Sequence, residues 1–258
     1  MMNGDYMKIE LIKKLANAKY KFKIDNSEII LYEDVIIDNN LLYKKEIDNE
    51  LFEKILKDNL YYDAYNKVLK YINIKMRSIY EVENYLNKLN IDDNDKNKII
   101  NKLKEINLLN DKVYASAFVS DKIHLSNDGP LKIKKELLGK KISEEIIDEE
   151  LNNYDNSIFE EKVKKIITKK KNSKYSNYIF KQKLLSFFIN LGYETELVLP
   201  IVDSIEVNTN DIVKKEYDLL YKKLSSKFND KKLDYEIRNR LYKKGFNMEE
   251  INNIKESD

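Results

Sequence analysis

Lysines and aromatic residues dominate one segment of the sequence, and together they could bind a polyanion. Residues 162–183 include nine lysines and no acidic residue, with three aromatic side chains in the second half. Ammonium groups can follow a phosphate backbone while rings stack on bases, or they can complement an acidic protein surface. A solvated helix end with its aromatics in the core would need no partner. The candidate contact residues are Lys164, Lys165, Lys169, Lys170, Lys171, Lys174, Tyr175, Tyr178, Lys181 and Lys183.

The charges around this segment are also segregated. Residues 143–161 include eight acidic side chains and neither lysine nor arginine. A second basic region, residues 214–244, has eleven basic and five acidic residues and holds Arg238 and Arg240, two of the three arginines in the chain. An arginine in such a lysine-rich sequence suggests a bidentate contact, although a surface ion pair explains it equally well. The balance of 47 basic against 45 acidic residues is therefore an average over blocks of opposite sign.

The composition argues against catalytic and metal-binding chemistry. Without cysteine there is no thiol nucleophile, disulfide or cysteine-ligated metal. His124 is the single histidine, which argues against histidine triads and histidine metal sites. The longest apolar run, Leu184 to Ile189, is too short to cross a membrane, and the N-terminus lacks an apolar signal region. We expect a cytoplasmic protein that is not an enzyme, uses no cofactor and has no membrane partner.

The first fifty-odd residues are predicted to form a small module with β-structure. Residues 20–24 alternate apolar and polar side chains, a turn cluster follows, and residues 28–32 are rich in β-formers, which predicts a hairpin. Residues 7–12 also alternate and predict a third strand. Asp48 can cap a short helix over residues 49–56.

From residue 58 onward the pattern is helical, because apolar residues recur at steps of three and four. Ser78 and Glu81 have the spacing of a capping box, in which each side chain bonds the other residue's amide. Asp92, Ser143 and Asn247 are further candidates for helix N-caps.

Four helix ends in this region can be superposed. Their anchor residues, Leu86, Leu137, Phe188 and Leu241, are separated by 51, 51 and 53 residues, and each is followed after four positions by an apolar residue and then a capping residue. Each interval has room for three helices, which predicts four tandem three-helix repeats. We expect a mainly α fold, in which the repeats form a curved, elongated array behind the small N-terminal module with its β-hairpin. The expected boundaries are 1–57 for the module and 58–109, 110–156, 157–208 and 209–258 for the repeats.

A more specific pattern in the first two repeats resembles the RecX family of regulatory proteins. Arg77-Ser78-x2-Glu81-x4-Leu86 is followed by Asp111-x2-Tyr114-Ala115 and then by Gly129-Pro130-x2-Ile133-x3-Leu137. These motifs agree with the family in order and spacing over roughly residues 64–151. The N-terminal module and the last two repeats fit the longer members from Firmicutes. The chain departs from the family pattern at Lys75, at Asn127-Asp128 and at Lys141, where an arginine, a basic residue and a glycine are usual.

The resemblance implies a non-enzymatic modulator of the RecA recombinase. Members of the family lie in the groove of the RecA filament on single-stranded DNA and inhibit strand exchange and ATP hydrolysis during recombination and DNA repair. We therefore expect a monomer that binds the RecA filament and contacts single-stranded DNA, directly or through the filament. Two alternatives remain: a DNA-binding protein of helix-turn-helix-like units that acts without RecA, and an α-helical scaffold for protein partners.

The motif residues also have structural interpretations. Arg77 could contact a partner, or it could bridge two helices through Glu81 or Asp111. We expect Asp111 to be the N-cap of the helix that follows it rather than a catalytic acid. Ala115 is expected at a close contact between helices, and Gly129-Pro130 at a helix start, where proline's missing N–H costs nothing.

Overall fold

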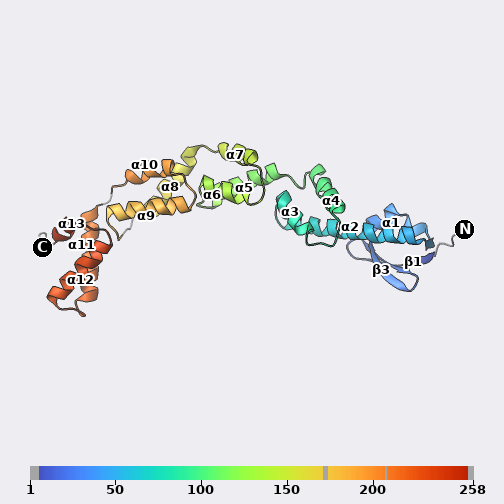
Figure 1. The fold of residues 1–258 in the computed structure, drawn as a ribbon, viewed down its shortest axis with the longest axis horizontal. Helices are drawn as coiled ribbons and strands as arrows, with labels where there is room; N and C mark the ends of the chain where they lie inside the picture. Colours follow the sequence, from blue (N-terminus) through green and yellow to red (C-terminus); the bar gives the residue numbers. More distant parts are fainter. Residues whose placement is uncertain (1–5, 171–173, 207, 255–258) are drawn as a thin grey trace. The chain divides into compact units, whose positions relative to one another are not determined.

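The computed structural model describes residues 6–170, 174–206 and 208–254, and the chain divides into two compact units, residues 1–114 and 115–258. Figure 1 labels the elements along the chain. The structure is mainly α-helical, as the sequence predicts, with a small antiparallel sheet near the N-terminus. Within the described residues, no helix is long and apolar enough to cross a membrane.

The N-terminal sheet contains the predicted hairpin and the predicted third strand. Its antiparallel strands run in the order β3-β2-β1-β4, and Phe22 pairs with Leu11 on one side and Ile29 on the other. Phe22 and Leu31 are buried in the core of this module. The elements are β1 (Met7–Leu15), β2 (Lys19–Ile24), β3 (Ser27–Tyr32), α1 (Glu33–Asp38), the 3-10 turn η1 (Leu41–Tyr43) and β4 (Glu46–Ile47).

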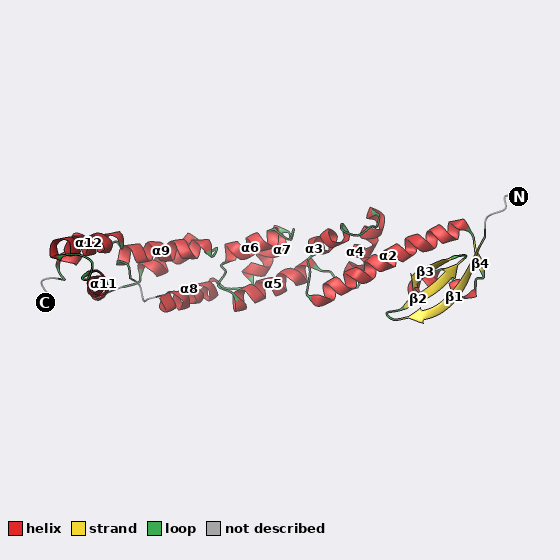
Figure 2. Ribbon diagram, turned by 90° about the horizontal axis from the view of Figure 1, so that it is seen from below, coloured by secondary structure: helices red, strands yellow, loops and turns green. Residues whose placement is uncertain are grey.

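The helix that follows is longer than expected. Asp48 caps it as predicted, since its carboxylate accepts from the Leu51 amide, but the helix α2 runs from Asn49 to Ile74 without a break. The predicted end at residue 56 is wrong, because no glycine, proline or competing cap interrupts the backbone there. The first half of α2 packs beside the sheet (Figure 2), where the side-chain oxygen of Asn59 accepts from the Tyr32 amide at 3.0 Å.

The second half of α2 packs on the two helices α3 (Ile79–Leu86) and α4 (Asp93–Glu105). The capping box of Ser78 and Glu81 and the cap at Asp92 form as predicted. Val82 and Leu86 point into the core of this group and are fully buried. One continuous helix therefore contributes to two cores, that of the sheet and that of α3 and α4.

The second unit is also helical. We propose that the four predicted repeats subdivide the helical part of the chain, each with three helices. Ser143 and Asn247 cap α7 and α13 as predicted. The helices are α5 (Asp111–Leu125), α6 (Pro130–Leu138), α7 (Glu144–Asn152), α8 (Asn156–Lys170), α9 (Asn177–Asn190), α10 (Thr195–Asp203), α11 (Thr209–Leu224), α12 (Asp230–Lys243) and α13 (Met248–Asn252).

The superposable helix ends of the second unit share one backbone motif. The amide five residues after each anchor donates to the anchor's carbonyl oxygen, and the residue before that amide has a positive φ. This is the Schellman motif, in which the two bonded residues also make an apolar contact. The four-residue gap in the sequence is therefore the span of this bond. The bonded pairs are Ile142–Leu137 (3.2 Å), Tyr193–Phe188 (3.0 Å) and Phe246–Leu241 (3.3 Å), with positive φ at Lys141, Gly192 and Gly245.

Backbone hydrogen bonds join successive groups of helices in this unit. At the start of α6, the Gly129 amide donates to the carbonyl oxygen of Leu191 at 2.7 Å. At the start of α9, the Ser176 amide donates to the carbonyl oxygen of Lys244 at 3.0 Å. A Cβ on Gly129 would lie only 2.5 Å from the carbonyl oxygen of Gly192, so the two chains approach more closely than side chains allow. We call these two contacts the backbone joints.

Candidate polyanion-binding interface

The lysines of residues 162–183 do not form one uniform surface, and two of them are structural. The Lys162 ammonium donates to the carbonyl oxygen of Ser126 at 3.1 Å, beyond the end of α5, and burial lowers the pKa of Lys162, opposed by the charge of Asp128. The Lys181 ammonium donates to the carbonyl oxygen of Asp203 at 2.6 Å, at the end of α10. Both cations satisfy carbonyl groups where a helix ends, which stabilises the fold.

Two further lysines of α8 are paired with acidic residues one turn earlier. Lys164 lies 3.4 Å from Glu160, and Lys165 lies 3.3 Å from Glu161. All four side chains are exposed or partly exposed, so each pair contributes only about 0.3–0.5 kcal/mol. These pairs reduce the positive charge of the first half of α8.

The remaining lysines line a hollow at the end of α8. Lys169 and Lys170 come from the last turn of this helix, Lys174 from the following loop and Lys183 from α9. The hollow has a volume of about 670 Å³, and its other lining residues are Tyr175, Phe180, Leu184 and Phe187. No acidic side chain is among the described residues that line it. Lys171, also predicted as a contact, lies outside the described residues. We call this site the basic hollow.

Aromatic rings, rather than carboxylates, are the neighbours of several of these ammonium groups. Lys170 lies 4.1 Å from the centre of the Phe187 ring, and Lys183 lies 4.7 Å from the centre of the Tyr175 ring. Across the part of the chain that the structure describes, none of the four lysines of the basic hollow forms an ion pair. Their charge is therefore available to an anion from outside, while the rings hold the side chains over an apolar floor.

A second depression continues from the basic hollow along α9. It has a volume of about 530 Å³, shares Lys183 and Phe187 with the basic hollow, and is also lined by Ile179, Gln182, Ser186 and Asn190, again without an acidic residue among the described ones. Tyr178 lies in the first turn of the same helix and is 69% exposed. Cations that alternate with accessible rings are the features by which proteins follow a single-stranded nucleic acid, with phosphates on the lysines and bases on the rings.

The arginines of α12 are engaged within the protein. Arg238 lies 2.8 Å from Asp234 and donates to the side-chain oxygen of Asn252 at 2.6 Å, which ties α12 to α13. Arg240 lies 3.5 Å from Glu236 on its own helix and is partly exposed. A role for either arginine in contacting a partner stays a prediction.

Arg77 is mostly buried between helices. Its guanidinium carbon lies 3.9 Å from the centre of the Tyr71 ring on α2, and one terminal nitrogen lies 3.6 Å from Glu81 on α3. Only 13% of the side chain is exposed, and its Nε is buried without a hydrogen-bond partner. The sequence suggested Glu81 and Asp111 as possible partners of Arg77, and the structure shows the contact with Glu81. Stacking on Tyr71 also connects Arg77 to α2.

Asp111 caps a different helix from the one expected. Asn110 is the N-cap of α5, since its side-chain oxygen accepts from the amides of Lys112 and Val113 at 3.0 and 3.2 Å. Asp111 instead accepts from the amide of Ile79 at 2.9 Å, at the start of α3. The prediction that Asp111 caps its own helix is wrong, because Asn110 occupies the cap position and leaves the next carboxylate free to reach α3.

The other motif residues serve packing. Ser78 and Glu81 bond each other's amides at 3.2 and 3.1 Å. Gly129 forms a backbone joint, and Pro130 is the first residue of α6. The remaining members are buried, and they are Leu86, Tyr114, Ala115, Ile133 and Leu137.

Sequence reasoning missed three residues that the structure makes important. Phe187 forms part of the floor of the basic hollow, and its helical spacing from Phe180, Lys183 and Leu184 was the signal that could have found it. Gly192 and Gly245 adopt positive φ at the helix ends. Each precedes the second apolar residue of the repeated pattern, where a Schellman motif favours glycine.

No metal site adds to this picture: among the described side chains, no group of three or more histidine, cysteine, aspartate or glutamate residues could hold an ion. The chemistry that the arrangement offers is anion binding on lysines combined with stacking on aromatic rings.

Comparison with known proteins shows that the chain is similar to one family. A family model described as RecX, second three-helix domain, matches residues 110–151. The regulatory protein RecX of Streptococcus agalactiae serotype V is 32% identical over 251 residues, which cover 95% of this chain and 97% of that protein. The RecX of Lactococcus lactis subsp. lactis is 30% identical and covers 96% of each chain.

Two solved structures are also similar. A crystal structure of regulatory protein RecX matches 77% of this chain and 100% of its own, with a TM-score of 0.65 and 23% identity, which supports the fold alone. The crystal structure of RecX from Lactobacillus salivarius matches 57% of this chain and 99% of its own, with a TM-score of 0.51 and 27% identity.

Proposed function

This chain belongs to the RecX family of regulatory proteins, and on that premise we propose that it binds the RecA filament on single-stranded DNA and inhibits its ATP hydrolysis and strand exchange. It acts by binding rather than by catalysis. The filament is its protein partner, and the DNA within the filament is the partner of the basic hollow. Through this inhibition the chain modulates recombination and DNA repair.

The observation that carries the proposal is the basic hollow. Four lysines without carboxylate partners among the described residues surround accessible rings, and a depression without acidic lining residues extends from them along α9. The phosphates and bases of one DNA strand match this pattern better than an acidic protein surface does. Carboxylates would pair with the lysines but would make no stacking contact with the rings. The second basic region, on α11 and α12, adds a further source of positive charge.

Inhibition follows from contacts with several filament subunits. A chain of repeats offers separate contact points, and weak contacts add when they are covalently linked. A molecule that holds neighbouring subunits together opposes the rearrangements that accompany each cycle of ATP hydrolysis. It also occupies space that a second DNA molecule needs for strand exchange.

ATP hydrolysis by purified RecA on single-stranded DNA tests the proposal. Substoichiometric amounts of this chain should lower the rate, and a constant rate at micromolar concentrations of the chain would refute the proposed function. Binding to bare duplex DNA that weakens with salt and needs no RecA would favour the alternative, a DNA-binding protein of helix-turn-helix-like units. Inhibition that persists when Lys169, Lys170 and Lys183 are neutralised would assign the contact to another surface.

A further inference from the structure

A second hollow lies in the same unit and shares no lining residue with the basic hollow. It is lined by residues of α6, α7, α8 and α10 and by the link between α7 and α8, and it has a volume of about 460 Å³. The backbone joint at Gly129 fixes its walls, because the start of α6 bonds directly to the turn that precedes α10. We call it the inter-helix groove.

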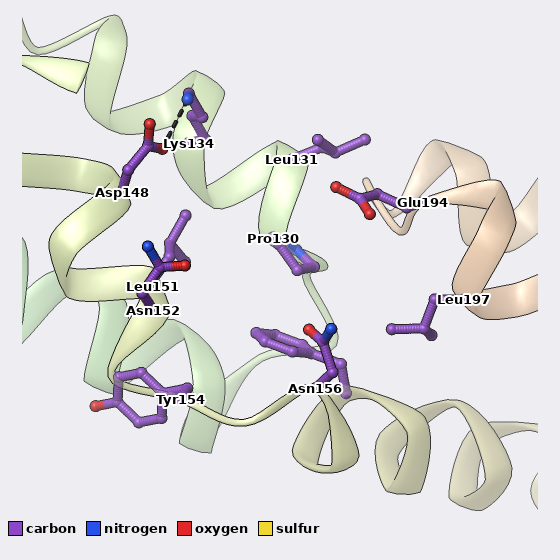
Figure 3. A pocket seen from close by; sticks show the side chains of 11 residues that line it. Pro130, Leu131, Lys134, Asp148, Leu151, Asn152, Tyr154, Asn156, Glu194 and Leu197 are labelled. Atoms are coloured by element: carbon purple, nitrogen blue, oxygen red, sulfur yellow. Dashed lines mark hydrogen bonds and ion pairs between the residues drawn. The ribbon is translucent and has the colours of Figure 1, made fainter. Parts of the chain in front are cut away.

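Apolar residues make up about half of the lining of the inter-helix groove, and we call them its floor. Figure 3 shows Pro130 at its centre, with Leu151 on the side of α7 and Leu197 on the side of α10. Leu131, at the start of α6, is 48% exposed. Tyr154 and Phe159 complete the apolar lining. The volume lies in the range of pockets that accept a small ligand or a few side chains.

Polar groups without partners surround this floor. Glu194 is the residue before α10, yet its side chain does not cap that helix, and no hydrogen bond or ion pair engages it within the described part of the chain. The side chains of Asn152 and Asn156 are likewise without hydrogen-bond partners there. Figure 3 shows Glu194 beside the start of α10 and Asn156 at the start of α8. At the far end, Lys134 is already bound to Asp148 at 2.7 Å.

Two of the elements around the groove, α7 and the start of α10, are acidic. Every charged side chain of α7 is acidic, and the start of α10 adds Glu194 and Glu196. The one lysine among the described lining residues, Lys134, is neutralised by Asp148 and lies 3.6 Å from Glu144. A cation next to an apolar group fits both the Glu194 carboxylate and the apolar part of the lining.

We propose that the inter-helix groove is a docking site for a segment of a protein partner in which a leucine-sized apolar side chain stands next to a lysine or arginine. The apolar side chain lies on Pro130, Leu151 and Leu197, and its cationic neighbour pairs with Glu194. The amides of Asn152 and Asn156 bond the backbone of the segment. The two hollows of this unit thus select partners of opposite charge, a polyanion in one and a basic protein segment in the other.

Disulfide tethering of short peptides tests this proposal, because the natural chain has no cysteine and a single thiol can be placed in the groove. The full-length Asn152→Cys variant is equilibrated with a mild reductant and one of three capped peptides, Cys-Gly-Leu-Arg, Cys-Gly-Leu-Glu or Cys-Gly-Gly-Arg. The fraction of protein that carries the peptide is read by mass spectrometry. Capture of the first peptide should exceed capture of the other two several-fold.

Two controls separate the groove from the rest of the surface. Ser186→Cys places the thiol in the basic depression beside Lys183, where the order of the two leucine peptides should reverse. Adding Glu194→Gln to Asn152→Cys should remove the preference for arginine over glutamate and leave the preference for leucine over glycine. Circular dichroism confirms that each variant is folded.

Equal capture of the three peptides at residue 152, or an unchanged arginine preference with Glu194→Gln, would overturn the proposal. The experiment contains neither RecA nor DNA. Its outcome is therefore independent of the proposed function, which stands or fails on ATP hydrolysis.

Discussion

The carboxylate of Asp111 accepts a hydrogen bond from the backbone amide of Ile79 at 2.9 Å, so the first residue of α5 caps the start of α3. Ser78 caps the same helix locally, through the amide of Glu81. Two of the free amides at this helix start are thus satisfied, one by the adjacent Ser78 and one by Asp111, which lies 32 positions beyond Ile79 in the sequence. The relationship gives two motifs of the family a common structural task.

Replacing Asp111 with alanine should destabilise the first unit. The Ile79 amide loses its acceptor, which typically costs about 1 kcal/mol for a helix cap. Urea unfolding followed by circular dichroism measures the change. Asn110→Ala tests the cap of α5 in the same way and serves as the comparison, while a loss of less than about 0.3 kcal/mol for Asp111→Ala would show that water replaces the carboxylate.

The Asp111→Asn variant should differ from the natural chain in its pH dependence. Burial raises the pKa of Asp111, although the Ile79 amide opposes the shift. Asp111 therefore keeps its proton to a higher pH in the folded state than in the unfolded state, where its pKa is about 3.9. The free energy of unfolding falls as pH rises from about 3.9 through the higher pKa of the folded state. Asparagine keeps an acceptor oxygen without the charge. From neutral pH to about pH 4, the natural chain should gain stability relative to Asp111→Asn in urea unfolding, and a constant difference would contradict the raised pKa.

Alanine at Gly245 or Gly192 should be strongly destabilising. Both glycines have positive φ, and a Cβ would collide with Ile179 at the first position and with Lys132 at the second. Left-handed backbone and overpacking together cost about 2–4 kcal/mol. Gly139→Ala is the matched control, because Gly139 has ordinary helical φ and ψ and should change the unfolding free energy by less than about 1 kcal/mol.

Neutralising lysines of the basic hollow should weaken binding to single-stranded DNA and lower its dependence on salt. The double variant Lys169→Gln, Lys170→Gln should reduce the slope of log affinity against log salt by about 0.7 for each lost phosphate contact. The matched control is Lys164→Gln, Lys165→Gln, which removes two paired charges from the same helix. Fluorescence anisotropy with a labelled oligonucleotide measures both, and equal slopes for the two double variants would contradict the assignment.

Replacing Phe187 with leucine should weaken the same binding without loss of fold. Leucine retains the apolar floor but removes the ring, and a stacked base contributes about 1–3 kcal/mol. The affinity should therefore fall by at least about fivefold, while the salt slope stays unchanged because no phosphate contact is lost. Tyr242→Leu, on an exposed ring of α12, is the control, and an affinity loss as large as that of Phe187→Leu would show a general effect of aromatic removal.

Much of the local structure could be predicted from the sequence, because it depends on residues close together in the chain. The hairpin, the caps at Ser78, Asp92, Ser143 and Asn247, and the anchor residues of the helix ends follow from spacing and residue type alone. The ion pairs of Lys164 and Lys165 also have a signal in the sequence, because a glutamate stands four residues before each lysine.

Contacts between distant residues could not be predicted in this way. The continuity of α2 beyond residue 56 depends on two cores that its halves cover, and the role of Asp111 depends on where α3 begins. Lys162 and Lys181 bond backbone carbonyl oxygens just after α5 and at the end of α10, and the sequence around the two lysines does not indicate these contacts. Only these tertiary bonds separate the structural lysines from those of the basic hollow.

The backbone joints impose an order on the folding of the chain during its synthesis. The amide of Gly129 finds its acceptor on Leu191, and the amide of Ser176 finds its acceptor on Lys244. A polypeptide leaves the ribosome with its N-terminus first. The hydrogen bond at the start of α6 therefore cannot form until residue 191 has emerged, and the bond at the start of α9 cannot form until residue 244 has emerged. The groups that contain α6 and α9 are thus each completed by the group translated next, and a ribosome that stalls before residue 244 leaves the start of α9 without its bond to Lys244.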